Sequence, residues 1–476
     1  YDLQGAVASG RFGPIELSEL RVRLSGVAPS TRLEASGRLD IAGHALVPLS
    51  GVVSADGSLA LTNVLASGGT LFGFPVRTGE QVLRREPGNY RVVMAGEPLV
   101  LSDRGSDPVA YWRLDEAGGT VVADSAKANR LRPAITGTYL GSPALNQPGA
   151  LAGPANARPS VRFDGVDDHV LLGSESAFDF TSALSVCVWV KVGAWTRDWQ
   201  AIVTKGDTSW RLSRYANTRR LSFDTTSAAG HHSLPGTLNV DDGQWHHVVA
   251  VYDGRAKYLF IDGALDGFAI HRETLRRNEA PVMLAENAEA RGRYFNGWID
   301  EVAVYDRALT PAEVGWHHQA GGGSVVSARA RLAVPGIQEI DVLGLVHPRG
   351  SASLVASAGS LTLPGFALSS AHAGLHRVPG TGAVAQWAGG LTLPFGSAVF
   401  NGTGDAAGNF TLHSAGAGTL DIGGFRFTQS SALVLTRTQV EGAGVLAFGG
   451  LNLAGTVRVP AGNGTPSFAG TASGST

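Results

Sequence analysis

The chain has little cysteine, no long apolar run and no excess of either charge, and each shortage excludes a class of protein. Its 476 residues include a single cysteine, Cys187, so no disulfide framework can hold the fold together. No apolar run approaches the roughly 18 residues of a membrane-spanning helix, so we expect no membrane insertion. A formal net charge of -2 offers no attraction to nucleic acid or to an anionic membrane surface, so we expect no nucleic acid partner.

The sequence is rich instead in glycine and in short aliphatic runs. Its 64 glycines, its 16% of charged residues and the scarcity of segments with a helical period predict an all-β chain with many turns. A chain of 476 residues also exceeds what one hydrophobic core usually organises, so we expect more than one domain. Cys187 falls in the alternating segment 184–192, which predicts a strand and a buried, unreactive thiol.

Residues 245–267 form the most informative stretch, WHHVVAVYDGRAKYLFIDGALDG. Its alternating apolar residues are interrupted by Asp253-Gly254 and Asp262-Gly263, and Asp-Gly accepts the positive φ that tight hairpin turns require. The stretch therefore predicts a β-hairpin of two antiparallel strands.

The same stretch belongs to a set of four motifs that follow one another in order. The other three are YWRLDE at 111–116 with Ala123-Asp124-Ser125 after it, VRFDGVDDHV at 161–170 and GWIDEVAVYDRAL at 297–309. Together the four motifs resemble the laminin-G-like, concanavalin A-like lectin/glucanase jelly roll over residues 107–321. This resemblance implies a β-sandwich, and a short helix is expected at 310–319.

Outside residues 107–321 the sequence repeats itself. The pattern Leu-x-Leu-small-Gly, or a close variant of it, recurs 26–30 residues apart, starting at Leu332, Leu361, Leu391, Leu420 and Leu446. The N-terminal part carries the same unit, because residues 39–43 fit the pattern and residues 50–61 align with 401–412. Each unit offers two short alternating strands that cannot bury a face alone, so neighbouring units must stack. We therefore expect a β-solenoid-like or stacked-hairpin array into which the jelly roll is inserted.

These patterns divide the chain into an N-terminal β-repeat region at 1–106, the jelly roll at 107–321 and a C-terminal β-repeat region at 322–476. The array ends in an unfinished unit at 468–474 and starts without a cap at Tyr1, and uncapped arrays expose strand edges that pair with other chains. Two interpretations stay open: the chain is a piece of a longer protein, or it polymerises through its strand edges.

The sequence gives no sign of catalysis. Jelly rolls that hydrolyse glucans carry E-x-D-x-x-E on one strand, and no such strand occurs here. The acidic cluster Asp164, Asp167 and Asp168 lies in a predicted turn, where the expected role is to cap backbone amides. Three His-His pairs, at 231–232, 246–247 and 317–318, suggest a metal, but adjacent residues of a strand face opposite sides and cannot easily ligate one ion. We therefore predict a non-enzymatic chain, and we expect His246-His247 of the hairpin stretch to serve packing.

A calcium site is what the resemblance implies most directly. Jelly rolls of this kind often hold one structural Ca²⁺ with carboxylate and carbonyl oxygens where the first strand meets the last. The matching positions here are Asp115, Asp124 and Asp300. In the alternative interpretation, Asp124 caps a turn and Asp300 pairs with an arginine such as Arg113.

Tryptophans concentrate in the jelly roll and predict a ligand surface. Eight of the nine lie between residues 112 and 316, and aromatic faces stack on sugar rings. The candidate ligand residues are three tryptophans in loop-like stretches and two neighbours that could hydrogen-bond hydroxyls or carboxylates: Trp195, Trp199, Trp210, Arg214 and Tyr215. In the alternative, these tryptophans fill the core between the sheets, as we expect of Trp189, Trp245 and Trp298.

Two functional hypotheses follow from these features. In the first, the chain is a non-enzymatic structural or adhesive protein, extracellular or on the cell surface, whose repeats form a rod or fibre and display the jelly roll as a recognition module. In the second, it is a secreted, Ca²⁺-dependent carbohydrate-binding module on a β-repeat stalk. The expected partners are further copies of the chain, glycans or surface proteins.

Overall fold

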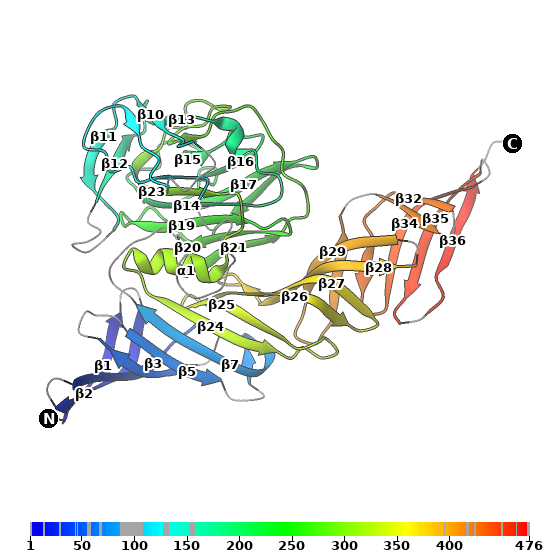
Figure 1. Ribbon diagram of the computed structural model, residues 1–476, viewed down its shortest axis with the longest axis horizontal. Helices are drawn as coiled ribbons and strands as arrows, with labels where there is room; N and C mark the ends of the chain where they lie inside the picture. The colour runs from blue at the N-terminus through cyan, green and yellow to red at the C-terminus, as the bar shows by residue number, and fades with distance from the viewer. Residues whose placement is uncertain are drawn as a thin grey trace.

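The molecule consists of a jelly roll that sits beside an elongated sheet, and the two chain ends lie at opposite ends of that sheet (Figure 1). The computed structural model describes residues 2–12, 15–27, 30–42, 44, 46–54, 59–65, 69–85, 108–126, 133–151, 158–394, 396–415, 418–422, 425–448, 451–462 and 464–473. Within these ranges all regular elements are strands, apart from α1 (Pro311–Ala320) and the short 3-10 helix η1 (Glu175–Phe178). None of the helical residues described forms a helix long and apolar enough to cross a membrane. The predicted all-β fold is therefore confirmed.

The segments on either side of the jelly roll form one sheet of 20 strands, called the long sheet below. Its strands are β1 (Asp2–Phe12), β2 (Ile15–Val27), β3 (Ser30–Leu39), β4 (Val47–Val53), β5 (Leu59–Leu65), β6 (Thr70–Leu71), β7 (Phe74–Arg85), β24 (Val325–Leu332), β25 (Ile340–His347), β26 (Ser351–Leu363), β27 (Phe366–Arg377), β28 (Val384–Leu393), β29 (Gly396–Gly404), β30 (Phe410–Ser414), β31 (Thr419–Ile422), β32 (Phe425–Gln429), β33 (Val434–Thr436), β34 (Gln439–Phe448), β35 (Leu451–Pro460) and β36 (Ser467–Ser473). All of its described pairings are antiparallel, and most join strands that follow one another in the chain. The flanking array is thus made of stacked hairpins, and the solenoid alternative is wrong.

The repeated sequence pattern marks every second turn of this array. Its copies at Leu361, Leu391, Leu420 and Leu446 lie where β26, β28, β31 and β34 end and the next strand begins. At Leu361, Leu391 and Leu420 a buried leucine is followed by an exposed residue, and Leu361 and Leu363 are 0% and 1% exposed. These leucines belong to one hydrophobic core that also includes residues of β2 to β7, and the half-buried Leu446 packs against it, so the long sheet buries one face along most of its length.

The jelly roll is carried on the connection between two neighbouring strands of the long sheet. β7 pairs directly with β24, with Arg84 opposite Val325 and Val76 opposite Leu332. The predicted boundary between residues 106 and 107 lies outside the described residues, whereas the one between 321 and 322 falls between α1 and β24. The chain thus leaves the long sheet at β7 and returns to it at the adjacent position.

Two sheets of eight strands form the sandwich. The β16 sheet consists of β18 (Gly230–Pro235), β17 (Leu221–Ser227), β16 (Trp210–Arg214), β15 (Ala201–Thr204), β22 (Met283–Leu284), β13 (His169–Leu172), β10 (Gly137–Leu140) and β9 (Val121–Val122). The β14 sheet consists of β11 (Ala144–Pro148), β12 (Pro159–Asp164), β23 (Asn296–Tyr305), β14 (Leu184–Val192), β19 (His246–Tyr252), β20 (Ala256–Ile261), β21 (Ala264–Ile270) and, beside β23, β8 (Ala110–Trp112). One apolar core lies between the two sheets.

The Asp-Gly stretch forms two successive hairpins rather than the single one predicted. Asp253-Gly254 turns β19 into β20, and Asp262-Gly263 turns β20 into β21. Asp262 and Gly263 have φ angles of 55° and 75°, which is the left-handed backbone that a tight turn of this kind requires. The second Asp-Gly therefore adds a third strand to the β14 sheet.

Helix α1 lies between part of the outer face of the β14 sheet and the long sheet (Figure 1). Thr310 caps the helix and forms a capping box with Glu313, while Pro311 occupies the first helical position, so the predicted helix at 310–319 is confirmed within a residue. A second core fills the space under α1 and includes Val325 and Leu345 of the long sheet. The jelly roll thus packs on the long sheet through a shared apolar layer.

Polar and aromatic contacts add to this packing on the side of β20 and β21. The Tyr258 hydroxyl lies 3.1 Å from Gln386 Oε1, and the rings of Phe268 and His376 stack with centroids 4.4 Å apart. Asn401 also donates a 2.6 Å hydrogen bond from Nδ2 to the carbonyl of Arg255. These contacts join the jelly roll directly to the long sheet.

Candidate functional site

Four of the five predicted ligand residues meet at one rim of the β16 sheet. The loop 193–200 and the turn between β16 and β17 place the rings of Trp199 and Tyr215 edge to face, with centroids 5.6 Å apart. The Arg214 guanidinium lies 5.4 Å from the centre of the Trp195 ring. All three aromatic side chains are half-buried, so each keeps part of its surface exposed.

Trp210 does not join them, and its predicted ligand role is wrong. Its side chain is 1% exposed, stacks on Phe180 at 6.4 Å and donates a 3.2 Å hydrogen bond from Nε1 to the carbonyl of Phe178. The alternation of β16 explains this position, because Trp210 and Leu212 point into the sandwich and Arg211 points out. Trp210 therefore belongs to the core between the sheets.

Arg214 has a structural role instead of the predicted ligand contact. Its guanidinium donates three hydrogen bonds of 2.6–2.7 Å, to the carbonyls of Arg197, Asn217 and Thr218. These bonds join the loop 193–200 to the β16–β17 turn. Arg214 thus fixes the two segments that carry Trp199 and Tyr215.

The backbone at Trp199 is unusual for a large side chain. Trp199 has φ 57° and Ala216 has φ 48°, both in the left-handed region, and the Trp199 amide donates a 3.1 Å hydrogen bond to the Ala216 carbonyl. A bulky residue rarely adopts this conformation, and residues that do are concentrated at functional sites. The fold therefore holds the Trp199 ring at the rim at some conformational cost.

A polar network beside Trp199 completes the site, and it was not predicted from the sequence. Arg211 pairs with Asp224 at 2.9 Å and with Asp207, and its guanidinium lies 5.1 Å from the centre of the Trp199 ring. Arg293 reaches the same Asp207 carboxylate at 2.7 Å. We call Trp199, Asp207, Arg211, Tyr215 and Arg293 the rim cluster. The signal in the sequence was the alternation of WRLSR and LSFDT, which turns Arg211 and Asp224 to the outer face.

Electrostatics keep the exposed carboxylate of this cluster charged. Burial alone would raise the pKa of Asp207, but the guanidinium groups of Arg211 and Arg293 and the amide of Asn287 outweigh it and lower that pKa. Asp207 is therefore an ionised acceptor beside two cationic donors, and about a third of its side chain is exposed. Such a group can bind hydroxyls, whereas a general acid needs a raised pKa.

The structure gives two of the three predicted calcium ligands protein partners. Asp124 accepts hydrogen bonds from the amides of Tyr111, Ala126 and Ile135 at 2.9–3.1 Å, as in the alternative of a turn cap. Asp115 pairs with Arg158 at 3.1 Å. The three carboxylates are not among the groups of described residues whose possible ligand atoms all lie within 4.8 Å of one another.

Asp300 differs from the other two because its carboxyl is only partly satisfied. The residue is 1% exposed, Oδ2 accepts a 2.8 Å hydrogen bond from the Ala150 amide, and no described residue bonds to Oδ1. Burial and the charge of Asp115 raise the pKa of Asp300 well above its usual range, although the nearby Arg113 opposes this. An ion pair between Asp300 and Arg113 is not present in the described part of the chain.

Two other sequence expectations are settled by hydrogen bonds and burial. Asp164 accepts from the Val166 amide at 2.8 Å, and Asp168 accepts from the Asp164 amide at 3.0 Å, so the predicted capping role of this acidic turn is confirmed.

Trp298, expected in the core, is half-buried on the outer face of the β14 sheet between Arg162 and Lys191, whose charged groups lie 5.1 and 4.9 Å from its ring centre. The cross-strand neighbours of Trp298 explain its position, because both are long cations that cover its ring.

The jelly roll matches a known family in sequence. Residues 164–315 match the model of the concanavalin A-like lectin/glucanases superfamily, so the predicted resemblance is confirmed for this part of the chain. No curated protein matches the chain.

Several solved structures are similar to the chain at low TM-scores. Domain 4 of AbnA, an extracellular arabinanase from Geobacillus stearothermophilus solved with arabinotriose, is 20% identical, with 45% of this chain and 98% of that one covered and a TM-score of 0.33. The binding domain of Paraclostridial Mosquitocidal Protein 1 is 10% identical, with 78% and 92% covered and a TM-score of 0.34. The ligand binding domain of Botulinum neurotoxin serotype D, solved with N-acetylneuraminic acid, is 9% identical, with 77% and 91% covered and a TM-score of 0.35.

Proposed function

We propose that the chain is a non-enzymatic extracellular binding protein whose jelly roll binds carbohydrate at the rim cluster and whose long sheet displays it. The observation that carries this proposal is Trp199, held in a left-handed backbone against Tyr215 and beside the charged network around Asp207. Carbohydrate sites combine an aromatic face, which stacks on the apolar side of a sugar ring, with a few fixed polar groups that bind hydroxyls. The lectin/glucanase-type sequence of residues 164–315 agrees with such a role.

Binding without hydrolysis is the reaction class that these residues support. Retaining and inverting glycosidases need one carboxyl that is protonated and one that is ionised. At the rim cluster Asp207 has a lowered pKa, and Asp224 is 1% exposed and held by Arg211. Both carboxylates are thus suited to hold arginines and accept hydrogen bonds, so we assign the site to recognition.

A glycan array of the full chain, followed by calorimetry on the ligands found, tests this proposal. Trp199→Ala removes the stacking face, and truncation of an aromatic anchor in a binding site costs roughly 1–2 kcal/mol, so we expect a loss of about fivefold to thirtyfold in affinity. Asp207→Asn should weaken binding further, because it removes the charge that orients Arg211 and Arg293. Trp298→Ala is the matched control, since Trp298 is also half-buried between cations but lies on the other sheet.

The array result separates the outcomes. Binding that survives Trp199→Ala but is lost in Trp298→Ala would move the site to the β14 sheet. A full chain that binds none of the glycans would remove the carbohydrate proposal altogether.

Calcium belongs to this proposal as a structural ion. Asp300, with its unbonded Oδ1, and Asp115, whose charge acts on it, are the residues that would hold it, whereas the hydrogen bonds of Asp124 suit a turn cap. A bound Ca²⁺ would neutralise two neighbouring carboxylates with hard oxygen ligands. The ion would then stabilise the end of the sandwich near the loop that follows β11.

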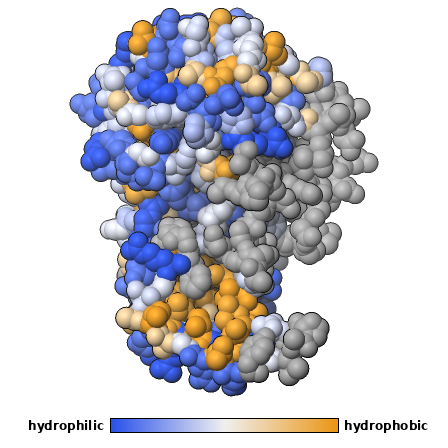
Figure 2. Space-filling model, turned by 90° about the vertical axis from the view of Figure 1, so that its left-hand side faces the viewer, coloured by the Kyte–Doolittle hydropathy of each residue, from blue (hydrophilic) through white to orange (hydrophobic). Residues whose placement is uncertain are grey.

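A second proposed function is self-association, which the ends of the long sheet favour. The described residues of β1 pair only with β2, and those of β36 only with β35, at opposite ends of the molecule (Figure 1). Leu3 and Val7 of β1 are 62% and 56% exposed, and Val22 of β2 shares their face. Figure 2 shows hydrophobic side chains gathered over this N-terminal part of the molecule. Exposed edges of this kind pair with strands of other chains, and β36 of a second copy is the partner we propose.

Electron microscopy and analytical ultracentrifugation test self-association. We expect filaments or concentration-dependent oligomers of the full chain, and Val7→Lys should abolish them because a charge on an edge strand opposes pairing. Val121→Lys is the control, because Val121 is 60% exposed on the jelly roll, away from both edges. A full chain that stays monomeric at high concentration would contradict this second function.

A further inference from the structure

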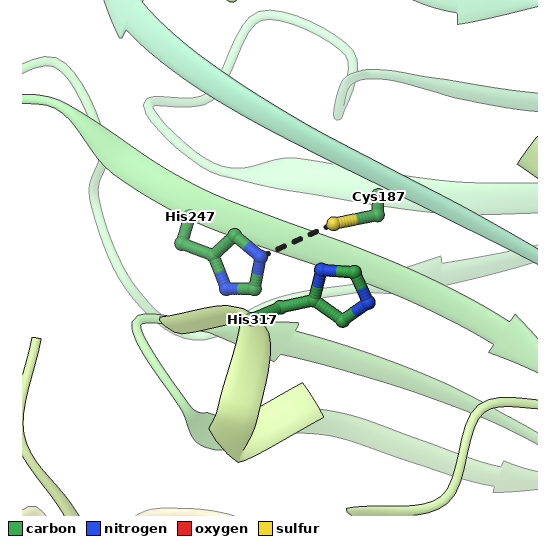
Figure 3. Close-up of side chains that lie close together, drawn as sticks. All are labelled: Cys187, His247 and His317. Atoms are coloured by element: carbon green, nitrogen blue, oxygen red, sulfur yellow. Dashed lines mark hydrogen bonds between the residues drawn. The ribbon is translucent and has the colours of Figure 1, made fainter. Parts of the chain in front are cut away.

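A second cluster of chemically active side chains lies on the other side of the jelly roll, under α1. Cys187 of β14, His247 of β19 and His317 of α1 converge there from three elements (Figure 3). Each is 0% exposed, and one possible ligand atom of each lies within 4.8 Å of the others. This juxtaposition is independent of the rim cluster, which occupies the opposite sheet.

The three residues come from different parts of the sequence and only one histidine of each pair takes part. His246, the neighbour of His247, points away and binds Asp262 and Asp242 at 2.7 and 3.1 Å. Adjacent strand residues therefore do not share an ion at His246-His247, whereas His317 and His318 lie on α1, where strand alternation does not apply. His247 and His317, from two different pairs, meet at Cys187.

One histidine of the cluster, His317, has the hydrogen bonding of a metal ligand, whereas Nδ1 of His247 is buried with no hydrogen-bond partner among the described residues. Cys187 Sγ lies 3.2 Å from His247 Nε2, and no other described residue bonds to either atom. The Tyr305 hydroxyl faces His317 Nε2 at 3.3 Å, and metal-binding histidines usually have one nitrogen held by such a group while the other faces the ion. Metal bonds of about 2.3 Å to sulfur and about 2.0 Å to nitrogen separate ligand atoms by roughly 3.5 Å, which these positions reach with small shifts.

The surroundings decide which ion the cluster can accept. The core around it is apolar and includes Trp189, Val249 and Leu345, so a net charge would be costly there. The nearest cation acting on His317 is Arg307, and it is neutralised by Glu313 at 2.8 Å. One thiolate and two neutral imidazoles carry a charge of -1 together, which a monovalent cation balances.

We propose that Cys187, His247 and His317 form a buried site for a thiophilic metal ion, with charge balance favouring Cu⁺ over Zn²⁺. Thiolate and imidazole ligands select these two ions among the common metals. On binding, the Cys187 thiol gives its proton to solvent as the sulfur–metal bond forms, and each imidazole donates a lone pair without losing a proton. No electron is transferred, and one proton is released per ion.

Such an ion would fix α1 to the sheet beneath it. Cys187 and His247 are in adjacent strands, and His317 lies on the helix that leads directly into β24 of the long sheet. The site would therefore stabilise the junction between the jelly roll and the long sheet, and it would act without any contact to carbohydrate.

Metal analysis of the full chain tests the site. Protein produced in medium supplied with copper or with zinc, then desalted, should carry about one ion per chain by plasma mass spectrometry. Cys187→Ala and His317→Gln should each lower the metal content at least about tenfold. X-ray absorption of the wild-type protein should show one sulfur and two nitrogen neighbours around the ion.

His318→Gln is the matched control, because His318 is the helix neighbour of His317 and stacks on His247 at 5.8 Å but lies outside the ligand group. Circular dichroism of all variants checks that the fold survives. Copper bound in preference to zinc supports the whole proposal, and zinc alone would support the site but overturn the charge argument. Wild-type protein with no more metal than Cys187→Ala, or equal losses in His317→Gln and His318→Gln, would overturn the site.

Discussion

Glu301 is predicted to lower the stability of the folded chain at neutral pH. Its side chain is 0% exposed, accepts a hydrogen bond from the Tyr111 hydroxyl at Oε2, and has no bonding partner at Oε1 among the described residues. Glu301 lies at an irregularity of the β14–β23 pairing and has φ 52°. Its carboxyl meets Tyr111, which belongs to the core under α1. Burial alone raises the pKa of Glu301 to about 8.

The pH dependence follows from this raised pKa. Between pH 4.5, the ordinary pKa of glutamate, and about 8, the folded chain keeps a proton on Glu301 that the unfolded chain has released. Stability therefore falls as pH rises through this window, by about 5 kcal/mol in all at about 1.4 kcal/mol per pH unit, and by about 3 kcal/mol at pH 7. Below pH 4.5 the residue is protonated in both states and contributes no pH dependence.

Glu301→Gln should remove this dependence. The variant is neutral at every pH, so calorimetry should show a Tm near that of the wild type at pH 4.5 and roughly 6–12 °C higher at pH 7. Glu313→Gln is the contrasting control and should lower the Tm at pH 7, because Glu313 is 1% exposed, pairs with Arg307 at 2.8 Å and accepts a 2.7 Å hydrogen bond from the Thr310 amide. A Glu301→Gln variant that is less stable than the wild type at pH 7 would refute the reasoning, since it would mean that Glu301 is ionised in the folded chain.

Two further predictions concern the calcium site and the inserted jelly roll. A chelator should lower the Tm of the full chain, and Asp300→Asn should make the Tm insensitive to chelator. The reason is that an ion that binds only the folded state adds about 2.7 kcal/mol of stability at a hundredfold excess over Kd. A wild-type Tm that chelator leaves unchanged would contradict the site. If residues 86–324 are replaced by a short glycine turn, circular dichroism should still show a folded long sheet, because β7 and β24 pair directly. Residues 107–321 alone should fold as well. If either product is unfolded, the two regions need each other to fold.

Local patterns in the sequence predicted the elements whose signals lie within a few residues. β14 spans the predicted segment 184–192, the Asp-Gly dipeptides form turns, and Thr310 caps α1. In each case the deciding interaction is between chain neighbours, so a short window contains it. The number of strands after residue 245 was underestimated because each Asp-Gly adds a turn.

The candidate sites were harder to predict because they depend on contacts between distant segments. Trp199 and Trp210 look alike in sequence, and only the strand boundary at Trp210 shows that one faces the rim and the other the core. Arg211 and Arg293 meet at Asp207 from separate strands and loops, and Cys187 meets His317 across the layer beneath α1. No single stretch of sequence carries these pairings, because tertiary packing decides them.

The direct pairing of β7 with β24 also has a mechanical consequence. If the two ends of the long sheet are pulled apart, tension passes from β7 to β24 through their own hydrogen bonds and bypasses residues 108–320. The jelly roll then carries none of this tension, and its rim cluster keeps its geometry while the sheet is stretched. An attachment domain placed in line between the two segments would instead be the first part to be stretched.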